Sequence, residues 1–226
     1  PHGYAVYNND DALGQAVKKL PLNHSLSYGR AEGSTLQARI IDESLNGLRL
    51  EISYEKESYE LTSSLIGAFS LYNILAAFAS GIALTVDVED IIAGIEGLKA
   101  VKGRMERVAD NIFVDFAHTP SAIESILRSL RSYAQGRLII VFGCGGDRDK
   151  EKRPKMGAIA TRLADLVVIT SDNPRNETPA EIIKDIVQGV VSDNYKIIED
   201  RTAAIRYAIS EKRAQDILVV AGKGHE

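Results

Sequence analysis

Residues 166–175 read Leu-Val-Val-Ile-Thr-Ser-Asp-Asn-Pro-Arg, so four consecutive apolar residues lead directly into a polar turn. This pattern is typical of a buried strand that ends in a turn before a helix. Taken alone, the turn can be a simple Asx-Pro turn that starts the next helix, with Arg175 on the surface. The alternative is a binding site, in which Asp172, Asn173 and Arg175 are held on a rigid turn at the end of a sheet.

Repetition of the pattern favours the binding site. Three other apolar runs end in polar clusters: 112–114 before Asp115 and His118, 138–142 before a glycine-rich stretch with Arg148, and 217–220 before Gly222 and Glu226. Ligands of open parallel α/β sheets bind beyond the carboxyl ends of the strands. We therefore expect all four clusters to face one crevice.

The second half of the chain has the alternating pattern of an α/β fold. The predicted strands end near 116 or span 138–142, 166–170, 196–198 and 217–220, and the predicted helices span 121–133, 155–163, 180–190 and 202–210. This order predicts a Rossmann-like, mostly parallel sheet with right-handed crossovers.

The first half has shorter, alternating segments. A strand at 5–7 and a helix at 13–20 precede four strand-like segments, 25–28, 36–41, 48–54 and 58–61, and two helices, 67–84 and 88–98. The segments predict a small antiparallel sheet, with Asn46-Gly47 as a hairpin turn. Asn73 lies inside the first apolar helix, and a buried amide with satisfied hydrogen bonds is the simplest interpretation from the residues alone. The polar break at 99–104 separates two predicted domains, 1–103 and 104–226.

Composition excludes several classes of protein. The chain has 226 residues, 45% of them hydrophobic, and a formal net charge of −4. No stripe of Lys and Arg occurs, so nucleic acid is not the expected partner. Cys144 is the single cysteine, and the four histidines lack metal-ligand spacing, so neither disulfides nor a metal site are expected. The apolar stretch at 74–84 is too short to cross a bilayer. We expect a soluble, cytoplasmic monomer that binds small molecules.

The glycine-rich stretch at 143–150 is not the phosphate loop GxxxxGK[ST], and that motif occurs nowhere in these residues. The chain is therefore not expected to hydrolyse ATP by itself. The glycines beside Cys144 permit positive φ and a close approach of the backbone to a ligand. Cys144 itself is expected to be a small filler of the core.

Arg148 and Arg175 follow two neighbouring strands and can both reach one carboxylate, since guanidinium groups bind carboxylates bidentately. Asp172 and Glu226 can then hold an ammonium group. Such a pocket suits an amino-acid substrate. The alternative is a set of surface ion pairs, which contribute little free energy.

Five motifs together resemble the Mur ligase family over residues 4–226. They are Gly103-Arg104-Met105-Glu106, Asp115-Phe116-Ala117-His118-Thr119-Pro120, the segment 142–154, Ser171-Asp172-Asn173-Pro174-Arg175 and Ala221-Gly222-Lys223-Gly224-His225-Glu226. Five motifs in order at compatible spacing are far more specific than any one of them.

The resemblance implies an ATP-dependent amide ligase of peptidoglycan precursor synthesis. Such an enzyme activates the D-glutamate carboxylate of a UDP-MurNAc-dipeptide (UDP-MurNAc-L-Ala-D-Glu) as an acyl phosphate, which an amino acid then attacks. In the family, the Asp-Asn-Pro-Arg motif marks the branch that adds meso-2,6-diaminopimelate. Diaminopimelate has a distal carboxylate that lysine lacks. A buried arginine pair would therefore be left unpaired when lysine binds, and the difference in binding free energy would be roughly several kcal/mol.

The resemblance also implies which residues bind each substrate. The diaminopimelate ligands would be Arg148, Asp172, Asn173, Arg175, Gly222 and Glu226, with the arginines on the distal carboxylate and Gly222 and Glu226 near the amine. The ATP ligands would be Asn73, Arg104, Asp115 and His118, with Asn73 reading the base and Asp115 the ribose hydroxyls.

Whole family members also carry a uridine-nucleotide domain, a phosphate loop, Mg²⁺ ligands and a carbamylated lysine, which would lie upstream of this chain. We therefore expect a fragment that is inactive alone, with a hinge near 101–104. Two alternatives stay open: a related Mur or folylpolyglutamate-type ligase for another amino acid, and a non-catalytic nucleotide- or amino-acid-binding module.

Overall fold

A computed structural model describes residues 3–224 of the chain. These residues fold into two compact units, which divide between Lys99 and Ala100. The division between them falls at the start of the polar segment 99–104 in which the sequence predicts the domain boundary.

The first unit contains a mixed sheet. In the described part of this unit its strands follow one another in space as they do in the chain: β1 (Ala5–Asn8), β2 (Ser25–Gly29), β3 (Leu36–Ser44), β4 (Gly47–Tyr54) and β5 (Glu57–Ser63). β3, β4 and β5 are antiparallel, as predicted, but β2 is parallel to both β1 and β3. The sheet is therefore mixed, and the prediction of an antiparallel sheet was wrong for β2. Alternation of apolar and polar residues predicts a strand but not the direction of its neighbour.

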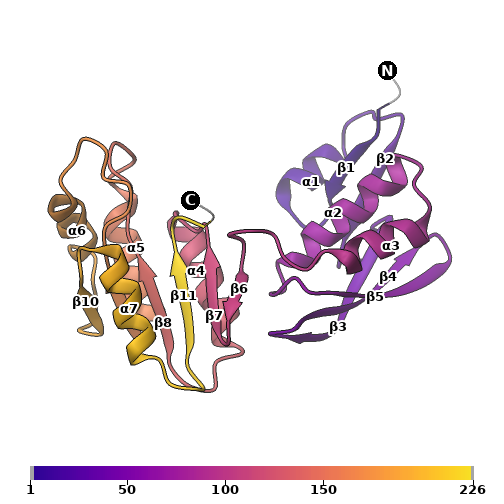
Figure 1. The fold of residues 1–226 in the computed structure, drawn as a ribbon. Coiled ribbons are helices and arrows are strands. Elements are labelled where there is room, and N and C mark those ends of the chain that lie inside the picture. The colour runs from indigo at the N-terminus through magenta and orange to yellow at the C-terminus, as the bar shows by residue number, and fades with distance from the viewer. Residues whose placement is uncertain (1–2, 225–226) are drawn as a thin grey trace. The chain divides into compact units, whose positions relative to one another are not determined.

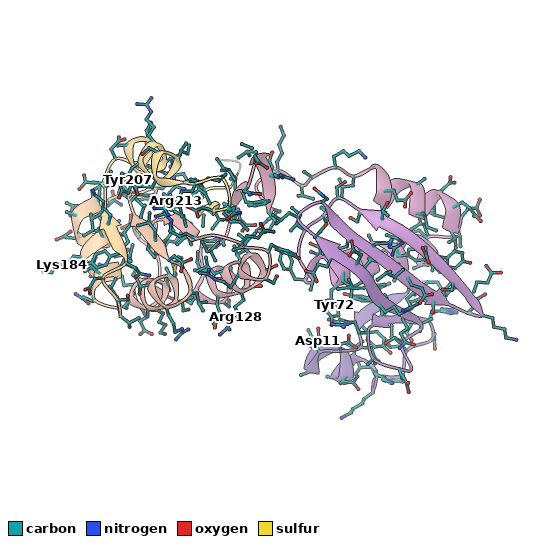
Figure 2. All side chains as sticks on the ribbon, turned by 90° about the horizontal axis from the view of Figure 1, so that it is seen from below. Asp11, Tyr72, Arg128, Lys184, Tyr207 and Arg213 are labelled. Carbon is teal, nitrogen blue, oxygen red and sulfur yellow. The ribbon has the colours of Figure 1, made fainter. Side chains whose placement is uncertain are left out.

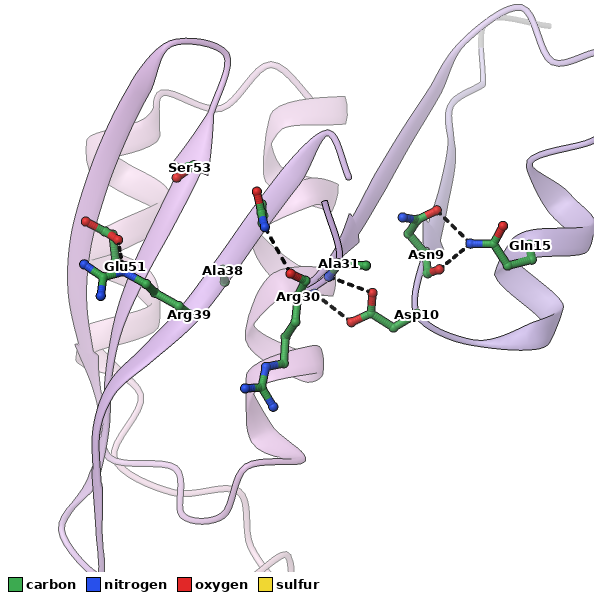
Figure 3. Close-up of a pocket in the computed structure, with 10 residues that line it drawn as sticks. Asn9, Asp10, Gln15, Arg30, Ala31, Ala38, Arg39, Glu51 and Ser53 are labelled. Atoms are coloured by element: carbon green, nitrogen blue, oxygen red, sulfur yellow. Dashed lines mark hydrogen bonds and ion pairs between the residues drawn. The ribbon is translucent and has the colours of Figure 1, made fainter. Parts of the chain in front are cut away.

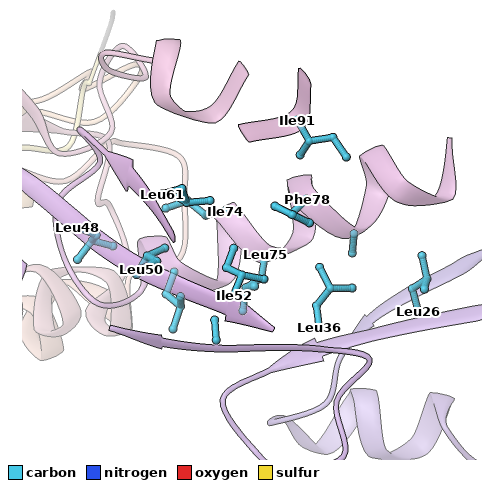
Figure 4. Close-up of a cluster of buried hydrophobic side chains, with 13 residues drawn as sticks. Leu26, Leu36, Leu48, Leu50, Ile52, Leu61, Ile74, Leu75, Phe78 and Ile91 are labelled. Atoms are coloured by element: carbon cyan, nitrogen blue, oxygen red, sulfur yellow. The ribbon is translucent and has the colours of Figure 1, made fainter. Parts of the chain in front are cut away.

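Residues of α2 and α3 pack against one face of this sheet. The first unit contains α1 (Ala12–Val17), α2 (Ser70–Ala83) and α3 (Val88–Gly97). Phe78 and Leu75 of α2 are fully buried against Leu36, Leu50 and Ile52 of the sheet (Figure 4). Apolar residues of α2 recur at helical spacing, so the helix has one buried face.

The second unit has a mostly parallel sheet, as predicted. The described strands lie in the spatial order β10 (Tyr195–Ile197), β9 (Leu166–Ile169), β8 (Leu138–Phe142), β11 (Ile217–Ala221), β7 (Ile112–Asp115) and β6 (Glu106–Ala109). Only the β6–β7 pairing of the described strands is antiparallel, and β6 was not predicted. The central strands β8 and β11 are buried along their whole length, as expected for strands covered on both faces.

Four helices of the described chain flank this sheet: α4 (Pro120–Arg131), α5 (Lys152–Leu163), α6 (Pro179–Val187) and α7 (Arg201–Glu211). α7 packs through Ala204 and Ala208 on one face, in front of the sheet in Figure 1, while α4 and α5 lie behind it. Charged residues are among the exposed ones on the covering helices, and Figure 2 shows Arg128 of α4 and Lys184 of α6 projecting outward. The result is a three-layer α/β unit in which the helices cover the two faces of the sheet.

Among residues 3–224, the helices are all too short or too polar to cross a bilayer.

The core of the first unit gives a direct test of the fold. Phe78 is fully buried, so Phe78→Ala removes a large apolar side chain and leaves a cavity. We expect a loss of about 3–5 kcal/mol in the free energy of unfolding, measured by urea denaturation. Leu84→Ala is the control, because Leu84 is 74% exposed and its truncation should change stability by less than about 0.5 kcal/mol. Equal effects of the two changes would contradict the described packing.

Candidate functional site

The four expected polar clusters follow neighbouring strands at one edge of the second sheet. β9, β8, β11 and β7 are adjacent in that order and all parallel. Their carboxyl ends therefore point the same way, and the segments that follow them emerge side by side. This confirms the predicted parallel sheet, and that the four clusters face one crevice stays a prediction.

The loop after β8 is joined to the loop after β9 through their backbones. The Gly146 amide donates to the Asn173 carbonyl over 2.9 Å, and Arg175 Nη1 donates to the Gly146 carbonyl over 2.8 Å. A Cβ built on Gly146 would lie 1.8 Å from the Pro174 carbonyl oxygen, so only glycine permits this approach. The close approach was predicted, but positive φ was not found at these glycines; it occurs instead at Asp147, with φ 53°.

Arg148 and Arg175 lie beside the same glycine. A Cβ built on Gly145 would lie 2.8 Å from Arg175 Nη1 and 3.9 Å from Arg148 Cγ. Both arginines are exposed, whereas the sequence reasoning assumed a buried pair. Water screens exposed guanidinium groups, so an unpaired arginine costs little here until a ligand covers it. The discrimination between substrates would then be smaller than for a buried pair.

Asp172 and Gly222 meet across β8. A Cβ built on Gly222, whose φ is +112°, would lie 2.9 Å from Asp172 Oδ2, and Asp172 Oδ1 accepts a 2.6 Å hydrogen bond from the Asn173 amide. Lys223 Nζ donates to Asn173 Oδ1 over 3.0 Å. The expected diaminopimelate set is therefore gathered at one place, apart from Glu226, which lies outside the described residues.

Arg201 was not predicted and belongs to the same edge. It is the first residue of α7, and its Nη2 donates to the Ala221 carbonyl over 3.0 Å. Its Nη1 is buried without a hydrogen-bond partner among the described residues. Burial lowers the pKa of the Arg201 guanidinium, and the charge of Asp172 partly opposes this. The sequence contained a signal for Arg201, because the strand predicted at 196–198, which corresponds to β10, is parallel to β9 and ends shortly before Arg201.

Three of the expected ATP ligands surround Phe116. The Arg104 guanidinium lies 5.1 Å from the centre of the Phe116 ring, and the His118 ring lies 4.9 Å from it, edge to face. Arg104 and His118 are exposed, and Lys152 Nζ donates to the His118 carbonyl over 2.8 Å. Together they form an exposed cationic and aromatic surface next to β7.

Asp115 is buried between these residues and fixes the local backbone. Its Oδ2 accepts from the Met105 amide and its Oδ1 from the Ala117 amide, each over 2.7 Å. Burial raises the pKa of the Asp115 carboxyl, while these two hydrogen bonds and Arg104 oppose the rise. A carboxylate has about four acceptor positions, so roughly two are left for a ligand.

Asn73 lies in the first unit, on the exposed side of α2. The interpretation as a buried core amide is therefore wrong. An exposed amide on an otherwise apolar helix is compatible with a ligand, which the resemblance implies.

Cys144 is a core residue, as predicted. It is 3% exposed, and its Sγ lies 3.7 Å from Met156 Sδ. Burial raises the pKa of the Cys144 thiol to about 12.

The first unit also contains a polar cavity of about 800 Å³ (Figure 3). Its polar groups bond to one another: Asp10 accepts from the Arg30 and Ala31 amides, and Gln15 Nε2 donates to the carbonyl of Asn9. None of the predicted site residues lines it.

Within residues 3–224, no group of three or more His, Cys, Asp or Glu side chains is arranged to hold a metal ion. The structure therefore assigns no metal ligand to this part of the chain.

Comparison with known families assigns both units. Residues 1–81 match the Mur ligase middle domain, and residues 103–224 match the Mur ligase glutamate ligase domain. The chain belongs to the Mur ligase family. The two matched domains correspond to the two units of the fold.

Individual Mur ligases are similar over almost the whole chain. The UDP-N-acetylmuramoyl-L-alanyl-D-glutamate--2,6-diaminopimelate ligase of Bacillus velezensis is 42% identical over 98% of this chain and 46% of its own length. Ligase 1 of the same name from Clostridium acetobutylicum is 41% identical over 98% of this chain and 47% of its own. A solved structure of a ligase of that name is 34% identical, with a TM-score of 0.66, over 99% of this chain and 48% of the other. The chain thus spans about half the length of the curated relatives it matches.

The contact between the two Mur ligase loops can be tested at Gly146. In Gly146→Ala the added methyl meets the Pro174 backbone, which cannot rotate away. We expect a loss of about 1–3 kcal/mol in the free energy of unfolding. Gly94→Ala is the control, because a Cβ there meets nothing within 4 Å and alanine favours the helix by about 0.5–1 kcal/mol. Urea unfolding of both variants checks this, and a neutral Gly146→Ala would disprove the close approach.

The burial and the raised pKa of the Cys144 thiol predict slow alkylation. With its thiol pKa near 12, roughly one molecule in 10⁴ is a thiolate at pH 8, so alkylation should be very slow. We expect almost no labelling by iodoacetamide in the native protein and complete labelling in guanidinium chloride, as measured by mass spectrometry. Fast native labelling would mean that Cys144 is accessible.

Proposed function

We propose that the protein that carries this chain is an ATP-dependent ligase that joins meso-2,6-diaminopimelate to the D-glutamate carboxylate of UDP-MurNAc-L-Ala-D-Glu. Relatives named for this reaction are 41–42% identical over nearly all of the chain. The choice of amino acid rests on one observation, which is that Arg148 and Arg175 lie beside the same residue, Gly145.

The sheet edge suits the far end of diaminopimelate, which carries a carboxylate and an ammonium group together. Arg148 and Arg175 would bind the distal carboxylate, since two guanidinium groups can share it through charge-assisted hydrogen bonds. Asp172, held against the backbone of Gly222, would bind the ammonium group, with Asn173 beside it. Lysine lacks the distal carboxylate and would leave both arginines covered but unpaired. Glu226, outside the described residues, is proposed to bind near the amine.

The residues around Phe116 fit the nucleoside of ATP. The exposed Arg104 guanidinium over Phe116, with His118 beside it, offers a surface on which a base can stack. Asp115 has acceptor positions left for ribose hydroxyls, and Asn73 of the first unit has an exposed amide that can read a base edge. ATP would supply the phosphoryl group that activates the D-glutamate carboxylate, and the amine of diaminopimelate would then displace phosphate. Mg²⁺ would accompany ATP, with no ligand assigned among residues 3–224.

Two other functions are compatible with the fold. A related Mur or folylpolyglutamate-type ligase would use another amino acid, and a non-catalytic module would bind a nucleotide or amino acid without ligation. Neither of these functions requires Arg175 to bind the distal carboxylate of diaminopimelate, whereas the proposed function does. We further propose a cytoplasmic monomer acting on small molecules only.

Arg175 tests the proposed substrate. In the full-length protein that carries these residues, Arg175→Ala removes one partner of the distal carboxylate. A charge-assisted hydrogen bond is worth about 1.5–3 kcal/mol, so we expect the KM for diaminopimelate to rise by about 10- to 100-fold. The KM for ATP should not change, because Arg175 follows β9, whereas the expected nucleoside ligands of this unit, Arg104, Asp115 and His118, lie around Phe116 at the end of β7.

Arg128→Ala is the matched control, because Arg128 is an exposed arginine of α4 that pairs only with Glu124 among the described residues. Its kinetics should equal those of the unchanged protein. Unchanged diaminopimelate kinetics in Arg175→Ala would remove the substrate assignment, while absence of any ligation by the unchanged protein would remove the proposed function itself.

A further inference from the structure

An ion pair connects α5 to the loop after β9, close to both loops that carry the site arginines. Arg153 of α5 is fully buried, and Glu177 belongs to the loop after β9. Arg153 Nη1 donates to Glu177 Oε2 over 2.9 Å, and Nη2 donates to Oε1 over 2.8 Å. This is a bidentate pair, which fixes orientation as well as distance. The hydrogen bonds from Arg153 lower the pKa of the Glu177 carboxyl, so Glu177 is charged at neutral pH.

Glu177 also holds the loop after β8. Its Oε1 accepts a 2.6 Å hydrogen bond from the Asp147 amide, and Lys150 Nζ lies 3.1 Å from Oε2. Arg153 Nη2 reaches the same loop through the Gly145 carbonyl, over 3.2 Å. Asp147 directly precedes Arg148, and Glu177 follows Arg175 by two residues. The Glu177 carboxylate is therefore bonded to the neighbour of Arg148 and lies two residues from Arg175 in the chain.

The backbone at both positions needs such support. Asp147 and Arg175 have φ of 53° and 52°, in the left-handed region that residues with a Cβ seldom adopt. Residues persist in this region when the surrounding structure fixes them. The bonds from Asp147 to Glu177 and from Arg175 to Gly146 are the fixing contacts in this case.

Asp185 provides an internal comparison. It is the second carboxylate on Arg153, with Arg153 Nη1 2.9 Å from its Oδ2. It lies on α6, however, and no hydrogen bond from its side chain to either loop is found among residues 3–224. Both carboxylates stabilise Arg153, but only Glu177 touches the loop that carries Arg148.

We propose that Glu177, with Arg153, is a positioning residue that sets the separation of Arg148 and Arg175 and thereby the preference for an amino acid with a distal carboxylate. The proposal rests on the proposed function. Glu177 does not itself bind diaminopimelate in this proposal, but it positions the two arginines that do.

The test compares Glu177→Gln with Asp185→Asn in the full-length protein that carries these residues. Each change neutralises one carboxylate on Arg153 with little change in shape. In Glu177→Gln, however, only one acceptor oxygen remains, so the new NH2 group must face the donors of Arg153 and Lys150 at the Oε2 position or those of Arg153 and Asp147 at the Oε1 position. We expect the KM for meso-diaminopimelate to rise by about tenfold or more in Glu177→Gln and by less than about threefold in Asp185→Asn. The KM for ATP should stay constant in both.

A purely structural role would look different. It would lower the fraction of active protein, and hence kcat, to a similar extent in both variants, without changing KM or the ratio of kcat/KM for diaminopimelate to that for L-lysine. Assays are run well below the melting temperature of each variant. We expect that ratio to fall only in Glu177→Gln.

Glu177→Asp serves if Glu177→Gln does not fold, because it keeps the charge but not the reach, and it should raise the same KM. If the unchanged protein uses diaminopimelate while the Glu177 variants behave like Asp185→Asn, the positioning role is wrong. If the unchanged protein does not ligate diaminopimelate, the proposed function fails first.

Discussion

The bidentate contact between Arg153 and Glu177 is the interaction on which the candidate site depends. It removes the Arg153 guanidinium from water and leaves the Glu177 carboxylate 14% exposed, and further hydrogen bonds to Gly145, Asp147 and Asp185 offset the cost of burial. Parallel strands bring the two loops to the same edge of the sheet. Glu177 then bonds one loop to the other, with Arg148 and Arg175 both beside Gly145 and both exposed.

The fold of the second unit could be predicted almost completely from sequence. The apolar runs at 138–142, 166–170 and 217–220 are short and bounded by turns, and helical patterns alternate with them, so a parallel sheet is the only common solution. The first unit was predicted less well. β2 is parallel to both of its neighbours, and next to it Ser27 and Thr35 exchange side-chain-to-backbone hydrogen bonds. That kind of contact leaves no periodic trace in a sequence.

The site shows the same limit. The sequence indicates which residues follow each strand, because the apolar runs and the polar clusters after them are visible in it, and Arg148, Asp172, Arg175 and Gly222 were predicted as site residues from such clusters and from the family motifs. Exposure and partners cannot be read from the chain. The exposure of Asn73, the buried Nη1 of Arg201 and the contact of Glu177 with Asp147 all depend on segments distant in sequence. The Mur ligase motifs recovered part of this information, because they reflect a known three-dimensional site.

The most direct test is a crystal structure of the full-length protein with meso-diaminopimelate bound. We expect one carboxylate of the ligand to lie within hydrogen-bond distance, about 2.7–2.9 Å, of the guanidinium groups of both Arg148 and Arg175. Diaminopimelate bound elsewhere, or held by only one of these arginines with the other turned to solvent, would contradict the proposed site.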